Sequence, residues 1–252
     1  MSRPEQATAL VTGASKGIGA AIAQALAADG WAVAVNYRSD KDGAERTVAA
    51  IEEAGGKAVA LHGDVANGAP AELFKQAEEQ LGAPVLALVN NAGAVRDMRF
   101  LSMTDDDWDL VIDTNLRSQF LCCRAALPGM VQRGRGRIVN ISSRAWLGGF
   151  GQANYSAAKG GVVSLTRSLA IEFAAKGVTV NAVAPGIVDT PLFRNFEPDV
   201  QAKLQASVPV RRIGTADDIA HAVAFFLDPR SSYVTGQTLY VCGGRSLSSP
   251  SV

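Results

Sequence analysis

Short apolar runs alternate with longer, alanine-rich segments along the whole chain. Near-continuous apolar strands are typical of a parallel sheet covered on both faces, and such a sheet needs right-handed crossover connections. The pattern predicts a single-domain, Rossmann-type α/β fold: a doubly wound, seven-stranded parallel sheet with helices on both faces. The predicted strands are residues 7–12, 31–37, 57–65, 84–92, 137–142, 178–185 and 238–241. The predicted helices cover residues 17–29, 40–54, 69–81, 104–131, 153–175 and 215–227.

No linker, repeat or low-complexity block divides the chain. Of its 252 residues, 48% are hydrophobic and 19% charged, which is enough apolar material for one large core. We therefore expect one domain over residues 1–252, ending in a flexible tail at about 246–252.

Charge and cysteine content exclude several classes of protein. The 24 lysine and arginine residues balance the 24 acidic residues, so no overall field favours nucleic acid or an anionic membrane. The first residues do not resemble a signal peptide, and no run approaches the roughly 18 apolar residues of a membrane span. Three cysteines and two histidines, without C-x-x-C spacing, argue against a disulfide framework or a metal site. We expect a cytoplasmic protein.

The glycine-rich stretch TGASKGIG, residues 12–19, follows the first predicted strand and opens the first helix. Gly13, Gly17 and Gly19 lie where a tight turn, close approach to a pyrophosphate and helix–strand packing require a missing side chain. The helix N-terminus would offer its N–H groups to phosphate. An ordinary left-handed turn is the alternative, but the strand–turn–helix context favours a dinucleotide site.

The end of the second strand bears on which dinucleotide is bound. Enzymes that use NAD often place an acid there to bind the adenosine ribose. Here the strand ends in Asn36, Tyr37 and Arg38, and no acid follows until Asp40. Arg38 and Lys16 would suit a 2′-phosphate, although both could equally be solvated surface cations. NADP(H) is therefore preferred, with NAD(H) as the alternative.

Polar and small residues also end the third and fourth strands, where ligands of such sheets bind. Asp64 would accept a hydrogen bond from the adenine amino group, or it could simply cap the following helix. Val65 follows it directly. After the fourth strand come Asn91, Ala92 and Gly93, and the glycine would let the backbone approach a nucleotide closely.

QANYSAAKGG, residues 152–161, places Tyr155 and Lys159 four residues apart, on one face of a predicted helix. A carbonyl that accepts a hydride develops negative charge on its oxygen and needs a proton. Tyrosine, with a pKa of about 10, is a poor acid–base catalyst at neutral pH unless its surroundings lower that value. A lysine cation one turn away would stabilise the phenolate, and a lowering by about two to three pKa units is within reach.

The motifs together resemble the classical short-chain dehydrogenase/reductase family. They are TGASKGIG, NNAG at 90–93, Asn115 in IDTNL, NISS at 140–143, YSAAK at 155–159 and PGIVDTP at 185–191, and the resemblance covers residues 5–245. It implies an NAD(P)-dependent enzyme that transfers a hydride between nicotinamide and a ketone or secondary alcohol, with Tyr155 as general acid/base. It also implies a catalytic tetrad, namely Asn115, Ser143, Tyr155 and Lys159.

The resemblance gives each tetrad member a role. Lys159 also holds the nicotinamide ribose, Ser143 donates a hydrogen bond to the substrate oxygen, and Asn115 kinks its helix and binds a water in a proton relay. The register of the serine is open. A separation of thirteen residues from the tyrosine, common among similar members, would select Ser142. We favour Ser143, the second serine of NISS, with a loop at 144–151 that is one residue shorter.

The segment PGIVDTP resembles the part of the family fold that lies beside the nicotinamide, although Pro185 and Gly186 could form a simple turn. The resemblance places the Ile187 backbone on the carboxamide and Thr190 near the phosphates. The predicted cofactor-binding residues are Gly13, Ser15, Lys16, Gly17, Ile18, Gly19, Asn36, Tyr37, Arg38, Asp64, Val65, Asn91, Ala92, Gly93, Tyr155, Lys159, Pro185, Gly186, Ile187 and Thr190.

Three segments should wall the substrate pocket: 94–100, 144–152 and 190–212, the last as a mobile lid. The predicted pocket is mostly apolar, although its aromatic residues could equally pack between subunits. Its residues are Val95, Ser143, Ala145, Trp146, Phe150, Leu192 and Phe193.

Within the family, NNAG-AVRDM and GQANYSAAK are most similar to the 3-oxoacyl-(acyl-carrier-protein) reductases. This implies a 3-ketoacyl thioester substrate, NADPH and docking of an acidic carrier protein, to which Arg133, Arg135 and Arg137 could contribute. Two positions depart from the pattern: Ile171 stands where an arginine docks the carrier, and Cys242 where aspartate or asparagine is common.

Two alternatives remain open at the level of sequence. One is a catabolic or secondary-metabolic carbonyl reductase or alcohol dehydrogenase acting on a free or cyclic ketone or a CoA thioester. The other is a nucleotide-binding protein that has lost catalysis, against which the intact Tyr155 and Lys159 argue. The resemblance also implies a homotetramer that pairs the helices near 104–131 and 153–175.

Overall fold

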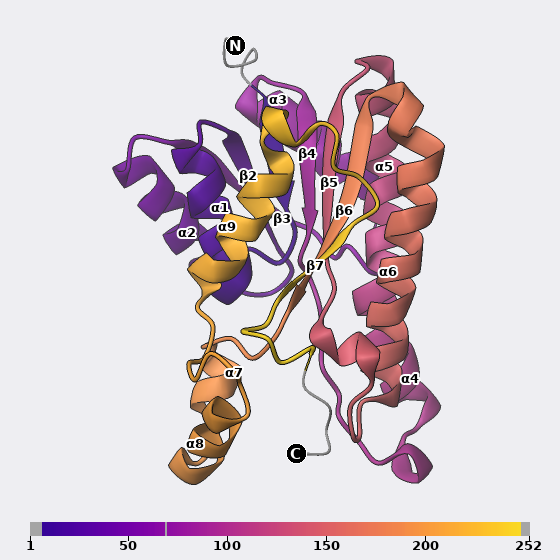
Figure 1. Cartoon of the computed structure of the whole chain (residues 1–252). Coiled ribbons are helices and arrows are strands. Elements are labelled where there is room, and N and C mark those ends of the chain that lie inside the picture. Colours follow the sequence, from indigo (N-terminus) through magenta and orange to yellow (C-terminus); the bar gives the residue numbers. More distant parts are fainter. Residues whose placement is uncertain (1–6, 69, 248–252) are drawn as a thin grey trace.

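A single parallel sheet forms the centre of the molecule in the computed structural model, which describes residues 7–68 and 70–247 (Figure 1). Its seven strands run in the order β3-β2-β1-β4-β5-β6-β7, so the direction of winding reverses between β1 and β4. The predicted fold class is confirmed. The strands are β1 (Thr8–Val11), β2 (Ala32–Tyr37), β3 (Lys57–His62), β4 (Val85–Asn90), β5 (Gly136–Ile141), β6 (Val178–Pro185) and β7 (Thr238–Val241).

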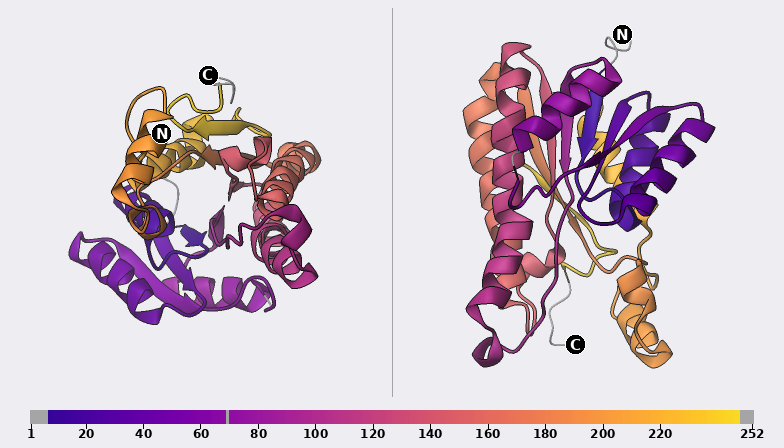
Figure 2. Two further views of the ribbon diagram at one scale, coloured as in Figure 1. Left: turned by 90° about the horizontal axis from the view of Figure 1, so that it is seen from below. Right: turned by 180° about the vertical axis from the view of Figure 1, so that it is seen from behind.

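Helices cover both faces of this sheet (Figures 1 and 2). One face is packed by α1 (Gly17–Ala28), α2 (Lys41–Glu53) and α9 (Ala216–Leu227). The other is packed by α3 (Pro70–Leu81), α5 (Ser118–Gln132) and α6 (Ala153–Phe173). In β1, Ala9 and Val11 belong to the core of the first face and Leu10 to that of the second, which explains why the strands are apolar throughout.

The predicted helix over 104–131 is interrupted. It consists of α4 (Asp105–Ile112), a π-helical turn over Asp113–Arg117, and α5. Asn115 lies at the centre of that turn, with its side chain fully buried. A π turn inserts one residue into the helical ladder and shifts the side chains that follow, so the two halves present different faces.

Two short helices were not predicted: α7 (Pro191–Arg194) and α8 (Pro198–Ala206). Each has a proline at its first position, and the Thr190 hydroxyl accepts a hydrogen bond from the Phe193 N–H to cap α7. Both project from the end of the sheet at which the strands terminate (Figure 1). They fall within the predicted lid at 190–212; of the predicted tail, residues 248–252 lie outside the described residues.

None of the helices in the described part of the chain is long and apolar enough to cross a membrane. The three cysteines are free, buried thiols, and burial raises the pKa values of Cys122 and Cys123. Among residues 7–68 and 70–247, no group of three acidic, histidine or cysteine side chains is arranged to hold a metal ion.

Candidate active site

The glycine-rich turn between β1 and α1 packs so closely on its neighbours that side chains are excluded. Gly13 has a positive φ of 62°, and a Cβ there would lie 2.9 Å from the Cα of Ala92. A Cβ on Gly19 would overlap the Gly13 carbonyl oxygen and the amide of Asn91. The glycines are thus required by the contact between the turn and the end of β4, and they leave backbone exposed to a ligand.

Buried polar side chains hold this turn in place. The Thr12 hydroxyl accepts hydrogen bonds from the N–H groups of Asn91 and Ala92, at 2.9 and 3.0 Å. In return, the Asn91 side chain donates to the carbonyls of Thr12 and Gly13, both at 3.0 Å. Asn36 accepts from the Gly13 N–H and donates to carbonyls at the end of β3. The side chain of Asn36, a predicted cofactor residue, is therefore committed to the protein backbone.

A first cavity, of about 360 Å³, lies beside the turn. Both predicted 2′-phosphate ligands, Lys16 and Arg38, line it together with Asp40. The Lys16 ammonium lies 3.8 Å from the Asp40 carboxylate, which also caps α2 by accepting from the Gly43 N–H. The lining consists of Gly13, Ser15, Lys16, Asn36, Tyr37, Arg38, Ser39, Asp40, Gly63, Asp64, Val65, Ala66, Asn91, Ala92, Gly93, Ala94 and Thr114.

Asp64 stabilises the turn that follows β3. Its carboxylate accepts hydrogen bonds from the N–H of Ala66, at 2.9 Å, and from Asn67. Burial acts to raise the pKa of Asp64, but these hydrogen bonds and the nearby Arg38 guanidinium outweigh it and lower the pKa. These bonds stabilise a turn at residues 65–67 and do not reach α3, which begins at Pro70, so the alternative that Asp64 caps the following helix is not observed. β3 ends at His62, three residues before the predicted end at Val65.

A second cavity, of about 550 Å³, adjoins the first and shares Asn91, Gly93 and Ala94 with it. It brings together all four predicted tetrad residues and the PGIVDTP segment. Its lining is Ile18, Asn91, Gly93, Ala94, Val95, Asp97, Asn115, Ile141, Ser142, Ser143, Arg144, Ala145, Gln152, Tyr155, Lys159, Pro185, Gly186, Ile187, Val188, Thr190, Phe193, Phe196, Leu204 and Arg245.

Tyr155 and Lys159 lie on the cavity side of α6. The Lys159 Nζ donates to the Ile141 carbonyl at 2.8 Å and lies 5.6 Å from the centre of the Tyr155 ring. Burial lowers the pKa of Lys159 to about 7. Burial also raises the pKa of Tyr155, opposed by a hydrogen bond with Ser143 and assisted by the charge of Asp97. The pKa of Tyr155 is thus raised, and the lowering expected from the neighbouring lysine is not what the structure shows.

The two serines after β5 point to different places. Ser142 is 2% exposed, and its hydroxyl donates to the Lys159 carbonyl at 2.9 Å, which ties β5 to α6. The Ser143 hydroxyl accepts from the Ala145 N–H at 3.1 Å and is within hydrogen-bonding reach of Tyr155. Of the two hydroxyls, only that of Ser143 meets the phenol.

The Asn115 side chain anchors the loop after β4 to the π turn. Its Nδ2 donates to the Ala94 carbonyl at 2.7 Å and to the Val111 carbonyl at 2.9 Å. Its Oδ1 is buried and has no hydrogen-bond partner among the described residues. A Cβ on Gly93 would lie 2.7 Å from this oxygen, so the glycine permits the contact.

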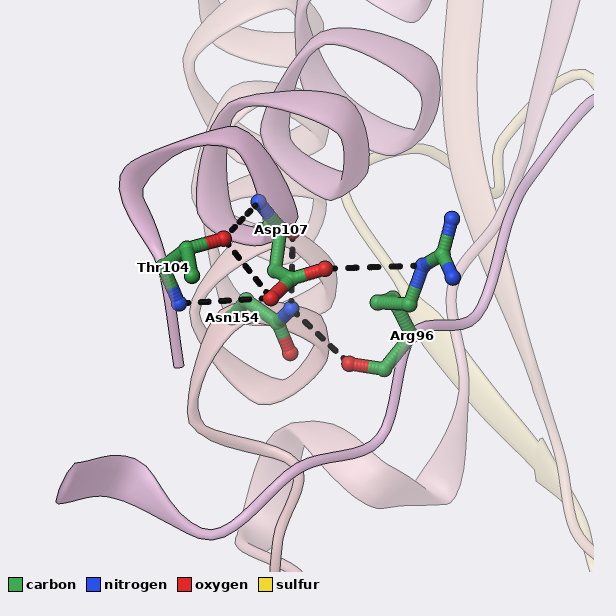
Figure 3. A network of polar contacts seen from close by, with 4 residues as sticks. All are labelled: Arg96, Thr104, Asp107 and Asn154. Carbon is green, nitrogen blue, oxygen red and sulfur yellow. Dashed lines mark hydrogen bonds and ion pairs between the residues drawn. The ribbon is translucent and has the colours of Figure 1, made fainter. Parts of the chain in front are cut away.

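Asn154 positions the start of α6, although the sequence analysis assigned it no role (Figure 3). Its fully buried side chain donates to the carbonyls of Arg96 and Asp107, both at 3.1 Å, and accepts from the Tyr155 N–H. Asp107 in turn pairs with Arg96 and closes a capping box with Thr104 (Figure 3). The role of Asn154 could have been inferred from the sequence, because an asparagine beside the first turn of a helix often hydrogen-bonds backbone groups there.

The substrate pocket differs in part from its prediction. Val95, Ser143, Ala145 and Phe193 line the second cavity. Trp146 instead stacks on Tyr240, and Phe150 is 90% exposed, so neither lines it. The side chain of Leu192 lies outside the described part of the chain. Conversely, the cavity contains Arg144 and Arg245, which sequence reasoning missed.

Comparisons with known proteins match nearly the whole chain. The profile of the family described as enoyl-(acyl carrier protein) reductase matches residues 13–246. A 3-oxoacyl-(acyl-carrier-protein) reductase FabG of Staphylococcus epidermidis is 43% identical, over 94% of this chain and 98% of its own. A 3-oxoacyl-(acyl-carrier-protein) reductase of Synechocystis is 45% identical, with coverages of 94% and 95%.

Two further relatives carry different names. The BbsD subunit of a hydroxy(phenyl)methylsuccinyl-CoA dehydrogenase from Thauera aromatica is 43% identical, over 95% of this chain and 96% of its own. The crystal structure of a putative gluconate dehydrogenase from Agrobacterium tumefaciens superposes with a TM-score of 0.90 at 34% identity, covering 97% of each chain.

Proposed function

Because the chain belongs to the short-chain dehydrogenase/reductase family of oxidoreductases, we propose that it reduces a ketone to a secondary alcohol with NADP(H), using Tyr155 as the general acid/base. One observation carries the proposal: Tyr155, Lys159 and Ser143 line a single cavity. That cavity shares Asn91, Gly93 and Ala94 with the cavity beside the glycine-rich turn. A proton donor and a dinucleotide site therefore adjoin each other.

The residues present fit a nicotinamide dinucleotide. The turn carrying Gly13 leaves backbone accessible, and α1 begins at Gly17 without a side chain capping its free N–H groups. Such a helix start favours a phosphate. When bound, the nicotinamide ring supplies or accepts the hydride. The proposed cofactor contacts are Gly13, Ser15, Lys16, Gly17, Ile18, Gly19, Asn36, Tyr37, Arg38, Asp64, Val65, Asn91, Ala92, Gly93, Tyr155, Lys159, Pro185, Gly186, Ile187 and Thr190.

The two cations of the first cavity support a preference for NADP(H). Arg38 and Lys16 both line it, as a 2′-phosphate would require. Asp40, the nearest acid after β2, is occupied as the cap of α2 and as the partner of Lys16. It is therefore poorly placed to bind a ribose in the way that NAD enzymes do, although NAD(H) remains the alternative.

Each catalytic side chain has a physical role in this proposal. Burial keeps the Tyr155 phenol protonated, so it can donate its proton to the carbonyl oxygen. Ser143 stabilises the charge that develops on that oxygen and hydrogen-bonds the phenol. Lys159 orients the cofactor and, when protonated, favours the tyrosinate that remains. Asn115, beside them, completes the proposed proton relay.

The substrate is proposed to be a 3-oxoacyl thioester, following the two reductases to which this chain is 43% and 45% identical. The segment 190–212 is proposed as the lid, because Phe193, Phe196 and Leu204 in it line the catalytic cavity.

The acyl carrier protein is a proposed partner. Ile171 is 84% exposed on α6, where carrier-dependent relatives would present an arginine.

The arginines expected to dock a carrier lie at the wrong end of the sheet. Arg133, Arg135 and Arg137 surround the start of β5, whereas the catalytic cavity lies beyond its end at Ile141. A strand of this length separates its ends by about 20 Å. A carrier that delivers its substrate to the cavity would therefore contact other residues.

The second candidate is a catabolic or secondary-metabolic carbonyl reductase that uses a free or cyclic ketone or a CoA thioester. It is favoured by the similarity to the BbsD subunit and to the putative gluconate dehydrogenase. We further propose a cytoplasmic homotetramer assembled through α5 and α6. Phe120 on α5 is 44% exposed, as an unpaired interface would require.

A substrate panel tests these proposals. Initial rates of NADPH and NADH oxidation would be compared on acetoacetyl-carrier protein, acetoacetyl-CoA and small cyclic ketones. A higher rate on acetoacetyl-carrier protein than on the other substrates supports reduction of carrier-linked 3-oxoacyl thioesters. Equal or lower rates on the carrier-linked substrate favour the carbonyl reductase that acts on a free or cyclic ketone or a CoA thioester. Tight cofactor binding without reduction of any ketone would instead indicate a nucleotide-binding protein that lacks catalysis.

A further inference from the structure

Two arginines line the catalytic cavity alongside the proposed catalytic residues. Arg144 directly follows Ser143 and opens a short 3-10 helix over Arg144–Leu147. Arg245 comes from the other end of the chain, after β7. The fold thus brings two cations from distant segments to the wall of one cavity, within the same space as Tyr155.

Arg144 is incompletely satisfied. Its Nε atom is buried and has no hydrogen-bond partner, and the guanidinium forms no ion pair with any acid in the described part of the chain. Buried donors of charged groups are costly to leave unpaired. Within the described part of the chain, Asp97 is the one carboxylate that lines the cavity, and it accepts a hydrogen bond from Gln152 at 2.9 Å instead.

Arg245 is held in place close enough to Arg144 for the two charges to interact. Burial and the charge of Arg144 together lower the pKa of Arg245. Its N–H donates to the Cys242 carbonyl at 3.1 Å, and the neighbouring Gly243 carbonyl accepts from the Val210 N–H at 3.2 Å. The two guanidinium groups thus lie near each other at the wall of a partly desolvated cavity, where their combined positive charge favours an anionic ligand.

We propose that Arg144 and Arg245 form a carboxylate-binding subsite, so that the ketone reduced in this cavity carries an ionised carboxylate. The planar donor groups of a guanidinium match a carboxylate in two-point hydrogen bonding. Arg144 is next to Ser143 in sequence, so the bound anion belongs to the same small molecule as the carbonyl. The inference rests on the proposed ketone reduction, and it favours a substrate that carries its own carboxylate over the simple 3-oxoacyl thioester proposed above.

Matched pairs of substrates test the subsite. The rates kcat/KM would be measured with NADPH for 2-oxo, 3-oxo and 4-oxo monocarboxylic acids and for their methyl esters, which differ chiefly in charge. We expect the acid to exceed its ester by about 10- to 100-fold at one chain length, the contribution typical of hydrogen bonds to charged groups. Esters reduced as fast as acids at every length would overturn the inference.

Variants assign the preference to the two arginines. Arg144→Gln and Arg245→Gln should each lower kcat/KM for the acid far more than for the ester and so remove most of the preference for the acid, and Arg144→Lys should restore part of it. Arg46→Gln, on the exposed surface of α2, is the matched control and should change neither rate. An acid preference that both glutamine variants retain would contradict the subsite.

A binding measurement separates this inference from the proposed function. Calorimetry would compare succinate with dimethyl succinate on the wild type and on Arg144→Gln, with NADP⁺ present. If no ketone is reduced but succinate binds only the wild type, the subsite stands and the proposed reaction fails. If esters are reduced and succinate binds neither protein, the reaction stands and the subsite fails.

Discussion

Replacing Lys159 by methionine should change how the stability of the fold depends on pH. The Lys159 side chain is 3% exposed, and burial lowers its pKa from 10.5 to about 7. At about 1.4 kcal/mol per pKa unit, this lowering corresponds to about 5 kcal/mol. The unfolded chain, in which the pKa is restored, binds the proton more tightly. The protonated lysine therefore opposes folding below pH 7.

The penalty disappears as the pH rises. Between pH 7 and about 10 the unfolded state holds a proton that the folded state lacks, so stability gains about 1.4 kcal/mol per pH unit from this group. Lys159→Met has no such group. At pH 6 the variant should therefore be more stable than the wild type, because it avoids the penalty of about 5 kcal/mol. The loss of the hydrogen bond to Ile141 reduces this gain in the free energy of unfolding by about 1 kcal/mol. Its advantage should shrink by roughly 3 kcal/mol by pH 9.

Urea unfolding at pH 6, 7, 8 and 9, at one protein concentration, measures this difference. Subtracting the two proteins cancels the titration of groups that they share. Lys75→Met, at an exposed lysine of α3, is the matched control and should show no pH-dependent difference. If the stability curves of the Lys159→Met variant and the wild type run parallel over this range, Lys159 titrates normally and the account of its burial is wrong.

Three further outcomes are expected. Ser143→Ala should lower kcat/KM by about 100-fold, whereas Ser142→Ala should mainly lower the free energy of unfolding, by about 1 kcal/mol; a Ser142→Ala variant that alone abolishes turnover would reverse the assignment. Arg38→Gln and Lys16→Gln should raise KM for NADPH about 10-fold and leave KM for NADH unchanged in steady-state kinetics; equal effects on both cofactors would argue against a 2′-phosphate site. Gly19→Ala should lower stability by about 1–3 kcal/mol in thermal unfolding, because its methyl group meets the backbone of the turn, and an unchanged melting temperature would contradict that packing.

The strands and most helices could be predicted because their signal is local. Apolar runs buried on both faces, such as β1 and β4, have no other common explanation in a chain of this composition. The glycine-rich turn could be predicted as well, because nearby atoms leave no room for a side chain at Gly13 or Gly19. Sequence spacing alone placed Tyr155 and Lys159 on one helical face, where the structure has them.

Features that depend on distant contacts were missed. Arg144 and Arg245 stand about a hundred residues apart, and only the closed fold shows that they share a cavity. Trp146 was expected to face substrate but stacks on Tyr240 of β7, a partner that no local pattern identifies. At Asn115, by contrast, the family resemblance did imply a kink in the helix, and the structure has a π turn there that a tertiary hydrogen bond joins to the loop after β4.

Single-turnover reduction by the Tyr155→Phe variant is the most direct test of the central claim. The phenol is proposed to donate the proton, so its removal should slow oxidation of bound NADPH by an accepted ketone by at least about 100-fold. Calorimetric affinity for NADPH should stay within a few-fold of the wild type. A variant that binds NADPH normally and still reduces the ketone at the wild-type rate would show that another group supplies the proton.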